Sequence, residues 1–127
     1  MSYKARVLCI DDEPGVVELV NLILKSQNIQ VIGAHSGKEG LEIMRKDPPD
    51  AVLLDIMMPE MDGLEVLTKL KGVSDTTSIP VILLTAKVQY EDVLGGYKLG
   101  ADYYITKPFT STQLINGINL LLGERKS

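Results

Sequence analysis

Polar side chains that could do chemistry follow four short apolar runs of the sequence. Asp11 and Asp12 follow the first run, Asp55 and Thr85 follow two later ones, and Lys107 follows the last. Three carboxylates brought together would repel and raise one another's pKa unless a cation neutralised them. Oxygen ligands of this kind suit Mg²⁺. With a metal ion and a lysine beside it, a carboxylate such as Asp55 could act as the nucleophile in phosphoryl transfer.

The elements that must bring these residues together are strands and helices in alternation. The predicted strands are mostly apolar instead of alternating, and they lie at residues 5–10, 29–34, 51–54, 81–84 and 103–106. Such runs are typical of a parallel sheet that helices cover on both faces. Parallel strands point the same way, so the polar residues at their carboxyl ends should meet at one edge, where open α/β sheets bind ligands.

Helix signals occupy the segments between the strands. Residues 16–25 have an apolar face with helical spacing, and Pro14 suits the first turn of that helix. Asn28 and Gly100 are expected to end helices, and the last helix should run from about residue 111 to 122. Capping boxes are predicted before two helices, from Ser36 with Glu39 and from Thr110 with Gln113.

Composition restricts the class of protein. The chain has 127 residues, of which 45% are hydrophobic, so we expect one domain over 1–127, with its core at about 5–122 and a tail or linker start at 123–127. The net charge of −4 and the lack of a long basic tract argue against direct nucleic-acid binding. No apolar run is long enough to span a membrane. A single cysteine and an amino terminus unlike a signal peptide predict a cytoplasmic protein.

Four motifs at the predicted strand ends carry a family resemblance. The stretches CIDDE, LLDIMMPEMDG, LLTA and GADYYITKPF occur in this order and together resemble the receiver domain of two-component response regulators. The resemblance covers about residues 6–122. It implies a doubly wound (βα)5, flavodoxin-like domain with a five-stranded parallel sheet of order 2-1-3-4-5, and a cis peptide bond between Lys107 and Pro108.

The resemblance also assigns roles to the acidic residues. It implies that Asp55 accepts a phosphoryl group from a histidine kinase or a phosphotransfer protein. Asp11, Asp12, Asp55 and the backbone carbonyl of Met57 would bind Mg²⁺, for which Mn²⁺ could substitute. Lys107 would pair with the phosphoryl oxygens as a compact point charge.

A switch is expected to follow phosphorylation. By the same resemblance, Thr85 hydrogen-bonds the phosphoryl group and Tyr104 is the aromatic that turns inward. The added charge would draw the fourth and fifth strands toward the site. The helix over about 90–99 contains Gly95 and Gly96, which each weaken a helix by about 1 kcal/mol, so this helix should shift easily. The expected output face comprises Val93, Tyr97 and Tyr104.

Several of these features allow another interpretation. The alternative role of Asp12 is a cap of the following helix and nothing more, and that of Tyr104 is packing in the core. The glycine pair could serve close packing instead of mobility. A hydrolase or mutase with an aspartyl-phosphate intermediate needs a second carboxylate two residues after the nucleophile, but Met57 stands there. The remaining alternative is a receiver-like binding module that takes no phosphate, although every pocket residue is present.

The sequence therefore predicts a signalling switch and not a metabolic enzyme; it would catalyse only its own phosphorylation and dephosphorylation. Its expected partners are a kinase or phosphotransfer protein and a downstream protein or a missing output domain. The expected oligomeric state is a monomer or a weak, phosphorylation-dependent dimer.

Overall fold

A computed structural model describes residues 3–85 and 90–126, with the backbone alone for 90–93 and 124–126. Strands and helices alternate along the described chain, as the sequence predicts. The elements are β1 (Ala5–Ile10), α1 (Pro14–Lys25), β2 (Ile29–Ala34), α2 (Gly37–Lys46), β3 (Ala51–Asp55), α3 (Gly63–Lys71), β4 (Val81–Thr85), α4 (Tyr90–Lys98), β5 (Tyr103–Thr106) and α5 (Ser111–Lys126).

The strands form one five-stranded parallel sheet in the order β2-β1-β3-β4-β5. This is the doubly wound, flavodoxin-like arrangement expected from the sequence. The strand order places β1 beside β3, with Cys9 opposite Leu53, and places the end of β3 beside β4, with Asp55 opposite Leu84. The ends of β1, β3 and β4 therefore lie side by side at the carboxyl edge.

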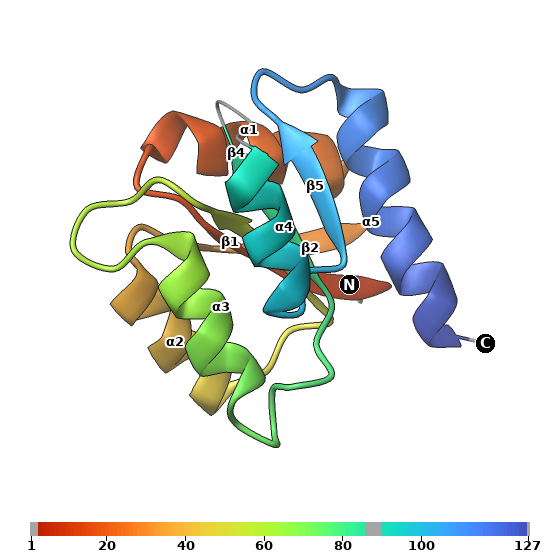
Figure 1. Cartoon of the computed structure of the whole chain (residues 1–127). Helices are drawn as coiled ribbons and strands as arrows, with labels where there is room; N and C mark the ends of the chain where they lie inside the picture. Colours follow the sequence, from red (N-terminus) through yellow and green to blue (C-terminus); the bar gives the residue numbers. More distant parts are fainter. Residues whose placement is uncertain (1–2, 86–89, 127) are drawn as a thin grey trace.

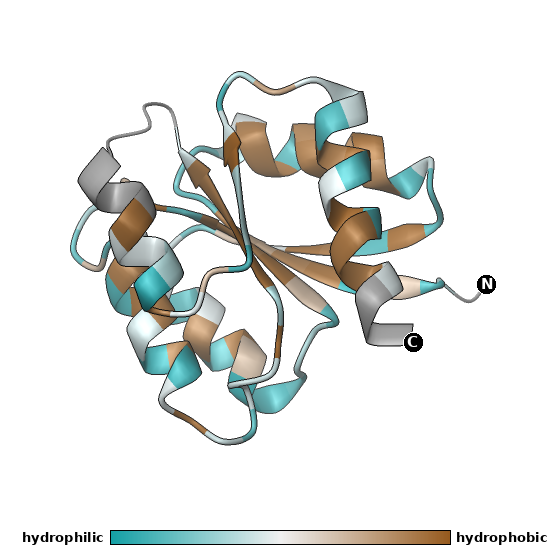
Figure 2. Ribbon diagram, turned by 45° about the vertical axis from the view of Figure 1, so that its right-hand side comes forward, coloured by the Kyte–Doolittle hydropathy of each residue, from teal (hydrophilic) through white to brown (hydrophobic). Residues whose placement is uncertain are grey.

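Helices cover both faces of the sheet, and each face has its own core. Figure 1 shows α1 and α5 on one side and α2, α3 and α4 on the other. Leu8 and Ile10 of β1 are buried with the second group of helices, whereas Val7 and Cys9 are buried with the first. Because neighbouring residues of a strand point to opposite faces, both sets must be apolar. This explains the continuous hydrophobic colouring of the central strands in Figure 2.

Local hydrogen bonds complete one of the two predicted capping boxes and form the other only in part. Before α5, the Gln113 amide donates to Thr110 Oγ1 and the Thr110 amide donates to Gln113 Oε1, which completes a capping box. Before α2, the Glu39 amide donates to Ser36 Oγ, but the Glu39 carboxylate accepts from the amide of His35 instead of that of Ser36. The helix-ending residues Asn28 and Gly100 have φ angles of 60° and 108°.

Three boundaries differ from the prediction. β3 and β4 each continue one residue further, so Asp55 and Thr85 belong to the strands and not to the loops after them. Their backbones remain in the sheet ladder although their side chains are polar. α5 continues to Lys126, beyond the predicted end near residue 122. Within 3–85 and 90–126, no helix has the length and apolar composition needed to cross a membrane.

Candidate functional site

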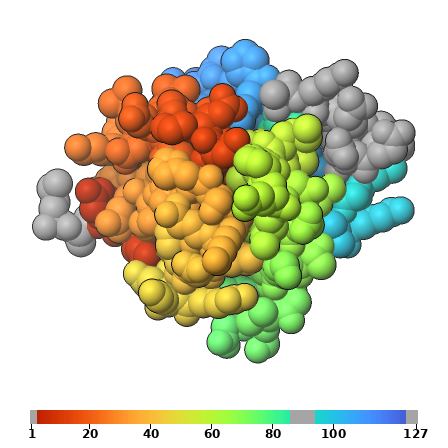
Figure 3. Space-filling view, turned by 90° about the vertical axis from the view of Figure 1, so that its left-hand side faces the viewer, coloured from red at the N-terminus to blue at the C-terminus, as the bar shows by residue number. Residues whose placement is uncertain are grey.

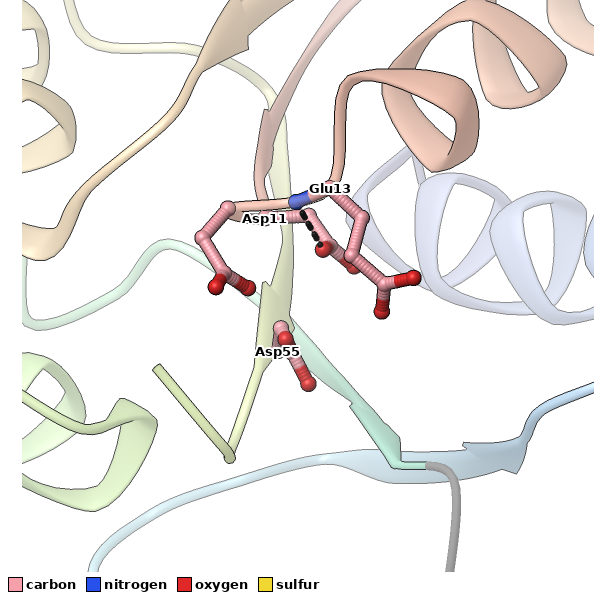
Figure 4. A group of neighbouring side chains, drawn as sticks. Asp11, Glu13 and Asp55 are labelled. Atoms are coloured by element: carbon pink, nitrogen blue, oxygen red, sulfur yellow. Dashed lines mark hydrogen bonds between the residues drawn. The ribbon is translucent and has the colours of Figure 1, made fainter. Parts of the chain in front are cut away.

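Four acidic residues converge at the carboxyl edge of the sheet. Asp11 and Asp12 follow β1, Glu13 is the N-cap residue of α1, and Asp55 is the last residue of β3. One carboxylate oxygen from each lies within 4.8 Å of the others. Figure 4 shows the side chains of Asp11, Glu13 and Asp55 around a common space. On the surface, the start of α1 lies beside the loop that follows β3 (Figure 3).

Lys107 supplies the positive charge of this cluster. Its ammonium nitrogen lies 2.7 Å from Asp11 Oδ2, 3.4 Å from Glu13 Oε1 and 3.6 Å from Asp55 Oδ1. The Lys107 side chain is only 12% exposed, and that of Asp11 is fully buried. Within the described residues, Asp11 Oδ2 accepts no hydrogen bond of normal geometry, so the ion pair offsets the burial of its charge. The lysine therefore lies nearest to Asp11, not to Asp55.

Asp55 is an unusually basic carboxylate. Burial, followed by the nearby charge of Asp11, raises its pKa from 3.8 to about 6, even though Lys107 and the amide of Met57 act in the opposite direction. Burial and a neighbouring negative charge both disfavour the ionised form of a carboxylate, which is why the proton is held to higher pH. Asp55 is thus a buried carboxylate, its residue being 2% exposed, that holds its proton to a higher pH than an ordinary aspartate does.

The pKa of Lys107 is raised, so the side chain is a permanent cation at neutral pH. Burial alone would lower its pKa, but the ion pair with Asp11 and the charges of Asp55 and Glu13 outweigh that effect. The residue is also fixed through its backbone, since the Lys107 amide donates to the carbonyl of Thr85 at 2.7 Å. The following Lys107–Pro108 peptide bond is cis. The cation is therefore held at the edge beside the end of β4.

The loop after Asp55 is held tightly against the site. The Ile56 amide donates to the carbonyl of Leu84, and the Gly63 amide donates back to the carbonyl of Ile56. A Cβ atom on Gly63 would overlap the Asp55 carbonyl oxygen, so only glycine permits this close approach. The Met57 amide donates to Asp55 Oδ1 at 3.3 Å, and the Met57 side chain is 71% exposed. Met57 thus lies at the mouth of the site.

The structure brings most of the residues predicted for the site together. Asp11, Asp12, Asp55 and Lys107 form one cluster. Thr85 is buried at the end of β4, the strand next to β3. Tyr104 lies farther back on β5, opposite Leu83, and packs half-buried against the core below α4. Of the predicted output face, Tyr104 and Tyr97 are described, and the Val93 side chain lies outside the described residues.

Two side chains correct the interpretation made from the sequence. Glu13 was not predicted as a site residue, yet its carboxylate joins the acid cluster and contacts Lys107. Its position directly after two aspartates was the available signal. The alternative role of Asp12 as a helix cap is not supported, because the N-cap residue of α1 is Glu13 and no side chain caps that helix end.

The comparison with known families decides the class of the protein. A profile of the response regulator receiver domain matches residues 7–119. The chain belongs to this family. Receiver domains are signalling domains of two-component systems, so the acid cluster at the sheet edge lies in a signalling domain.

Individual relatives agree with the family assignment. The receiver domain is 40% identical over 116 residues to the probable transcriptional regulatory protein TcrX of Mycobacterium tuberculosis, covering 91% of this chain and 49% of TcrX. It is 36% identical over 119 residues to protein PilH of Pseudomonas aeruginosa, covering 94% of this chain and 98% of PilH. A CheY-like receiver protein from Methanospirillum hungatei superposes with a TM-score of 0.91 at 29% identity, over 98% of both chains. The receiver domain therefore spans about half of TcrX but nearly all of PilH.

Proposed function

We propose that this receiver domain is a phosphorylation-activated switch in which Asp55 accepts a phosphoryl group from a histidine kinase or a phosphotransfer protein. The observation that carries the proposal is the buried, basic carboxylate of Asp55 with the Lys107 ammonium group 3.6 Å away. A nucleophile and a charge-neutralising cation both contribute to phosphoryl transfer.

The proposed reaction moves the phosphoryl group from a histidine of the donor to Asp55 and then to water. An oxygen of the Asp55 carboxylate attacks the phosphorus of a phosphohistidine, the phosphorus–nitrogen bond breaks, and the electron pair leaves with the imidazole, which takes up a proton. The product is an acyl phosphate on Asp55. Water later attacks the same phosphorus, and the carboxylate and inorganic phosphate are released. Lys107 offsets the charge of the phosphoryl oxygens throughout.

The donor set fits a divalent metal ion. Asp11, Asp12 and Asp55 offer carboxylate oxygens to one space. Their combined negative charge is larger than the single positive charge of Lys107 can neutralise. Mg²⁺ is the cation expected for such oxygens, Mn²⁺ is a plausible substitute in the same donor set, and the Met57 carbonyl is a further proposed ligand. When bound, the ion would supply charge stabilisation to the transferring oxygens.

The conformational relay is proposed to pass through Thr85 and Tyr104. A phosphoryl group on Asp55 adds strong hydrogen-bond acceptors next to the end of β4, where the Thr85 hydroxyl can donate. Because the Lys107 amide is bonded to the Thr85 carbonyl, a shift of either residue is transmitted to β5, which carries Tyr104.

The proposed output face is formed by α4, β5 and α5. Tyr97 is 45% exposed there, and a surface hollow of about 260 Å³ is lined by Tyr103, Tyr104, Ile105, Thr106, Gln113 and Asn116. A downstream protein, or an output domain such as the remainder of TcrX, is the proposed partner. The domain is proposed to act in the cytoplasm as a monomer or a weak dimer that phosphorylation favours, which light scattering with and without phosphodonor would test.

Intact-mass measurement after incubation with acetyl phosphate and Mg²⁺ tests this function directly. We expect the mass of one phosphoryl group to be added to the wild-type chain and to Asp75→Asn, a matched change at an exposed aspartate. Asp55→Asn and samples with EDTA should gain nothing. An adduct that persists in Asp55→Asn would refute the assignment of the acceptor. A wild-type chain that gains no mass, with rapid hydrolysis excluded by time courses, would favour the binding-module alternative.

A further inference from the structure

Tyr104 is in close contact with the helix that precedes its own strand. α4 ends at Lys98, and only a short turn separates it from Tyr103, the first residue of β5. The ring of Tyr104 packs against the core between the sheet and α4. Gly96 of α4 is buried at this contact, whereas its neighbour Gly95 is partly exposed. The two adjacent glycines therefore have different surroundings.

A side chain at position 96 would collide with the tyrosine. A Cβ atom there would overlap the Tyr104 hydroxyl oxygen, would lie 3.1 Å from Tyr104 Cζ and would lie 2.6 Å from Leu83 Cδ1. At Gly95, a Cβ atom would meet no atom within 4 Å among the described residues. Of the two alternatives left open by the sequence, close packing therefore applies to Gly96, and Gly95 has no such requirement.

Backbone hydrogen bonds at the end of α4 hold Gly96 next to Tyr104. The Ala101 amide donates to the Gly96 carbonyl at 2.9 Å, and the Gly100 amide donates to the Tyr97 carbonyl at 3.1 Å, which closes the helix end. The Asp102 amide then donates to the carbonyl of Val81 on β4. These bonds fix the end of α4 relative to β4 and to the start of β5, so the Gly96 backbone stays next to the Tyr104 ring.

A second aromatic ring links this contact to the surface. The ring centroids of Tyr97 and Tyr104 are 5.3 Å apart, and the ring planes are tilted by 59°. The rings are in contact in a tilted arrangement, at a separation at which aromatic pairs attract each other. Because Tyr97 is half exposed on α4, a displacement of Tyr104 alters the surroundings of a side chain that a partner can touch.

We propose that Gly96 is a positioning residue of the switch: the bare Cα leaves a notch in α4 that receives the hydroxyl end of Tyr104. The notch couples the position of the tyrosine ring to the position of α4, and through Tyr97 to the surface. The switch role of Tyr104 rests on the proposed function, but the notch itself does not. Gly95 serves as a built-in control because the same substitution there changes helix propensity alone.

Substitution of each glycine by alanine separates these effects. Urea unfolding of Gly95→Ala should show a two- to fivefold larger folding equilibrium constant, from improved helix propensity. Gly96→Ala gains the same propensity but must displace the ring, so its constant should fall by about tenfold or more relative to Gly95→Ala. Tyr104→Phe removes the overlapping oxygen. In that background, the difference between the folding equilibrium constants of Gly95→Ala and Gly96→Ala should become smaller. A gap of unchanged size would overturn the proposal.

Ring resonances give a readout that stability alone would not move. With ¹³C-labelled tyrosines, of which the chain has five, Gly96→Ala should shift the signals of Tyr104 and Tyr97 and leave that of Tyr3 unchanged. Gly95→Ala should leave Tyr104 unchanged. If Gly96→Ala alone is too unstable to fold, the double variant with Tyr104→Phe should recover part of the stability, although Leu83 Cδ1 remains 2.6 Å from the added Cβ. A double variant no more stable than Gly96→Ala would contradict the notch.

The same samples distinguish this proposal from the proposed function. Acetyl phosphate and Mg²⁺ should shift the Tyr104 signal in the wild-type chain and shift it less in Gly96→Ala, while intact mass shows the Asp55 adduct in both. An adduct accompanied by an identical Tyr104 response in both chains would refute the coupling. Absence of the adduct from the wild-type chain would refute the phosphorylation switch, and with it the switch role of Gly96.

Discussion

Replacement of Asp55 by asparagine should make the folded domain more stable, although it removes the proposed phosphoryl acceptor. The raised pKa means that the folded state holds the Asp55 proton to higher pH than the unfolded chain does. Ionisation of Asp55 therefore costs the folded state free energy, mainly because of burial and of the neighbouring charge of Asp11. Asparagine has nearly the same shape, keeps an oxygen to accept from Met57, and has no charge.

The magnitude follows from the two pKa values. A change from 3.8 to about 6 corresponds to about 3 kcal/mol, at about 1.4 kcal/mol for each pKa unit. The wild-type chain should lose this stability as the pH rises from about 4 to about 6, and the full penalty should remain above that range. The stabilising effect of Asp55→Asn should accordingly be near zero at about pH 4 and should reach about 3 kcal/mol at about pH 7.

Urea unfolding in EDTA, measured across this pH range, provides the assay. Asp75→Asn, at an exposed position, is the matched control and should follow the wild-type chain. Addition of Mg²⁺ at about pH 7 should stabilise the wild-type chain more than Asp55→Asn, since a metal ion bound by Asp55 favours the folded state. An Asp55→Asn chain that is no more stable than the wild type at pH 7, or whose advantage does not change with pH, would refute the electrostatic reasoning.

Three further predictions concern other described residues. Lys107→Met should destabilise the domain by about 3–5 kcal/mol at neutral pH, because it leaves the buried acids without a cation. Urea unfolding measures this, with Lys38→Met at an exposed position as the control. Equal stability of the two variants would contradict the reasoning. Cys9 is fully buried, and burial followed by the Asp11 charge raises its pKa to about 12, so a thiol reagent should label it only after unfolding; fast labelling of the folded chain would contradict this. Thr110→Ala should cost about 1 kcal/mol in thermal or urea unfolding through loss of the cap, whereas Thr110→Ser should retain most of it.

The fold was predictable because the strands and most of the helices have local signals of their own. Continuous apolar runs required a sheet covered on both faces, and the Thr110–Gln113 cap could be identified from two residue types three positions apart. The convergence of Asp11, Asp55 and Lys107 followed from parallel strands ending at one edge. The last residues of β3 and β4 were missed, since a polar side chain after an apolar run resembles a loop while its backbone still lies in the ladder.

Features that depend on side chains from distant elements were not predictable. Glu13 is one acidic residue among many in the sequence, and only the position of the Lys107 ammonium group makes it part of the cluster. Gly95 and Gly96 are indistinguishable in the sequence, because they differ only in that the Tyr104 ring contacts Gly96 and not Gly95. The preference of Lys107 for Asp11 over Asp55 likewise depends on a difference in distance that spacing does not encode.

The strand order also determines when the charges meet during synthesis. β1 pairs with β3 near the middle of the sheet, so Asp11 and Asp55 can come together once about the first half of the chain has left the ribosome. Lys107 follows β5, which is the last strand to emerge and lies at an outer edge. Chains are made from the amino terminus, so the acids are synthesised before their counter-ion. The final strand therefore both completes the sheet and brings the counter-ion of the pocket.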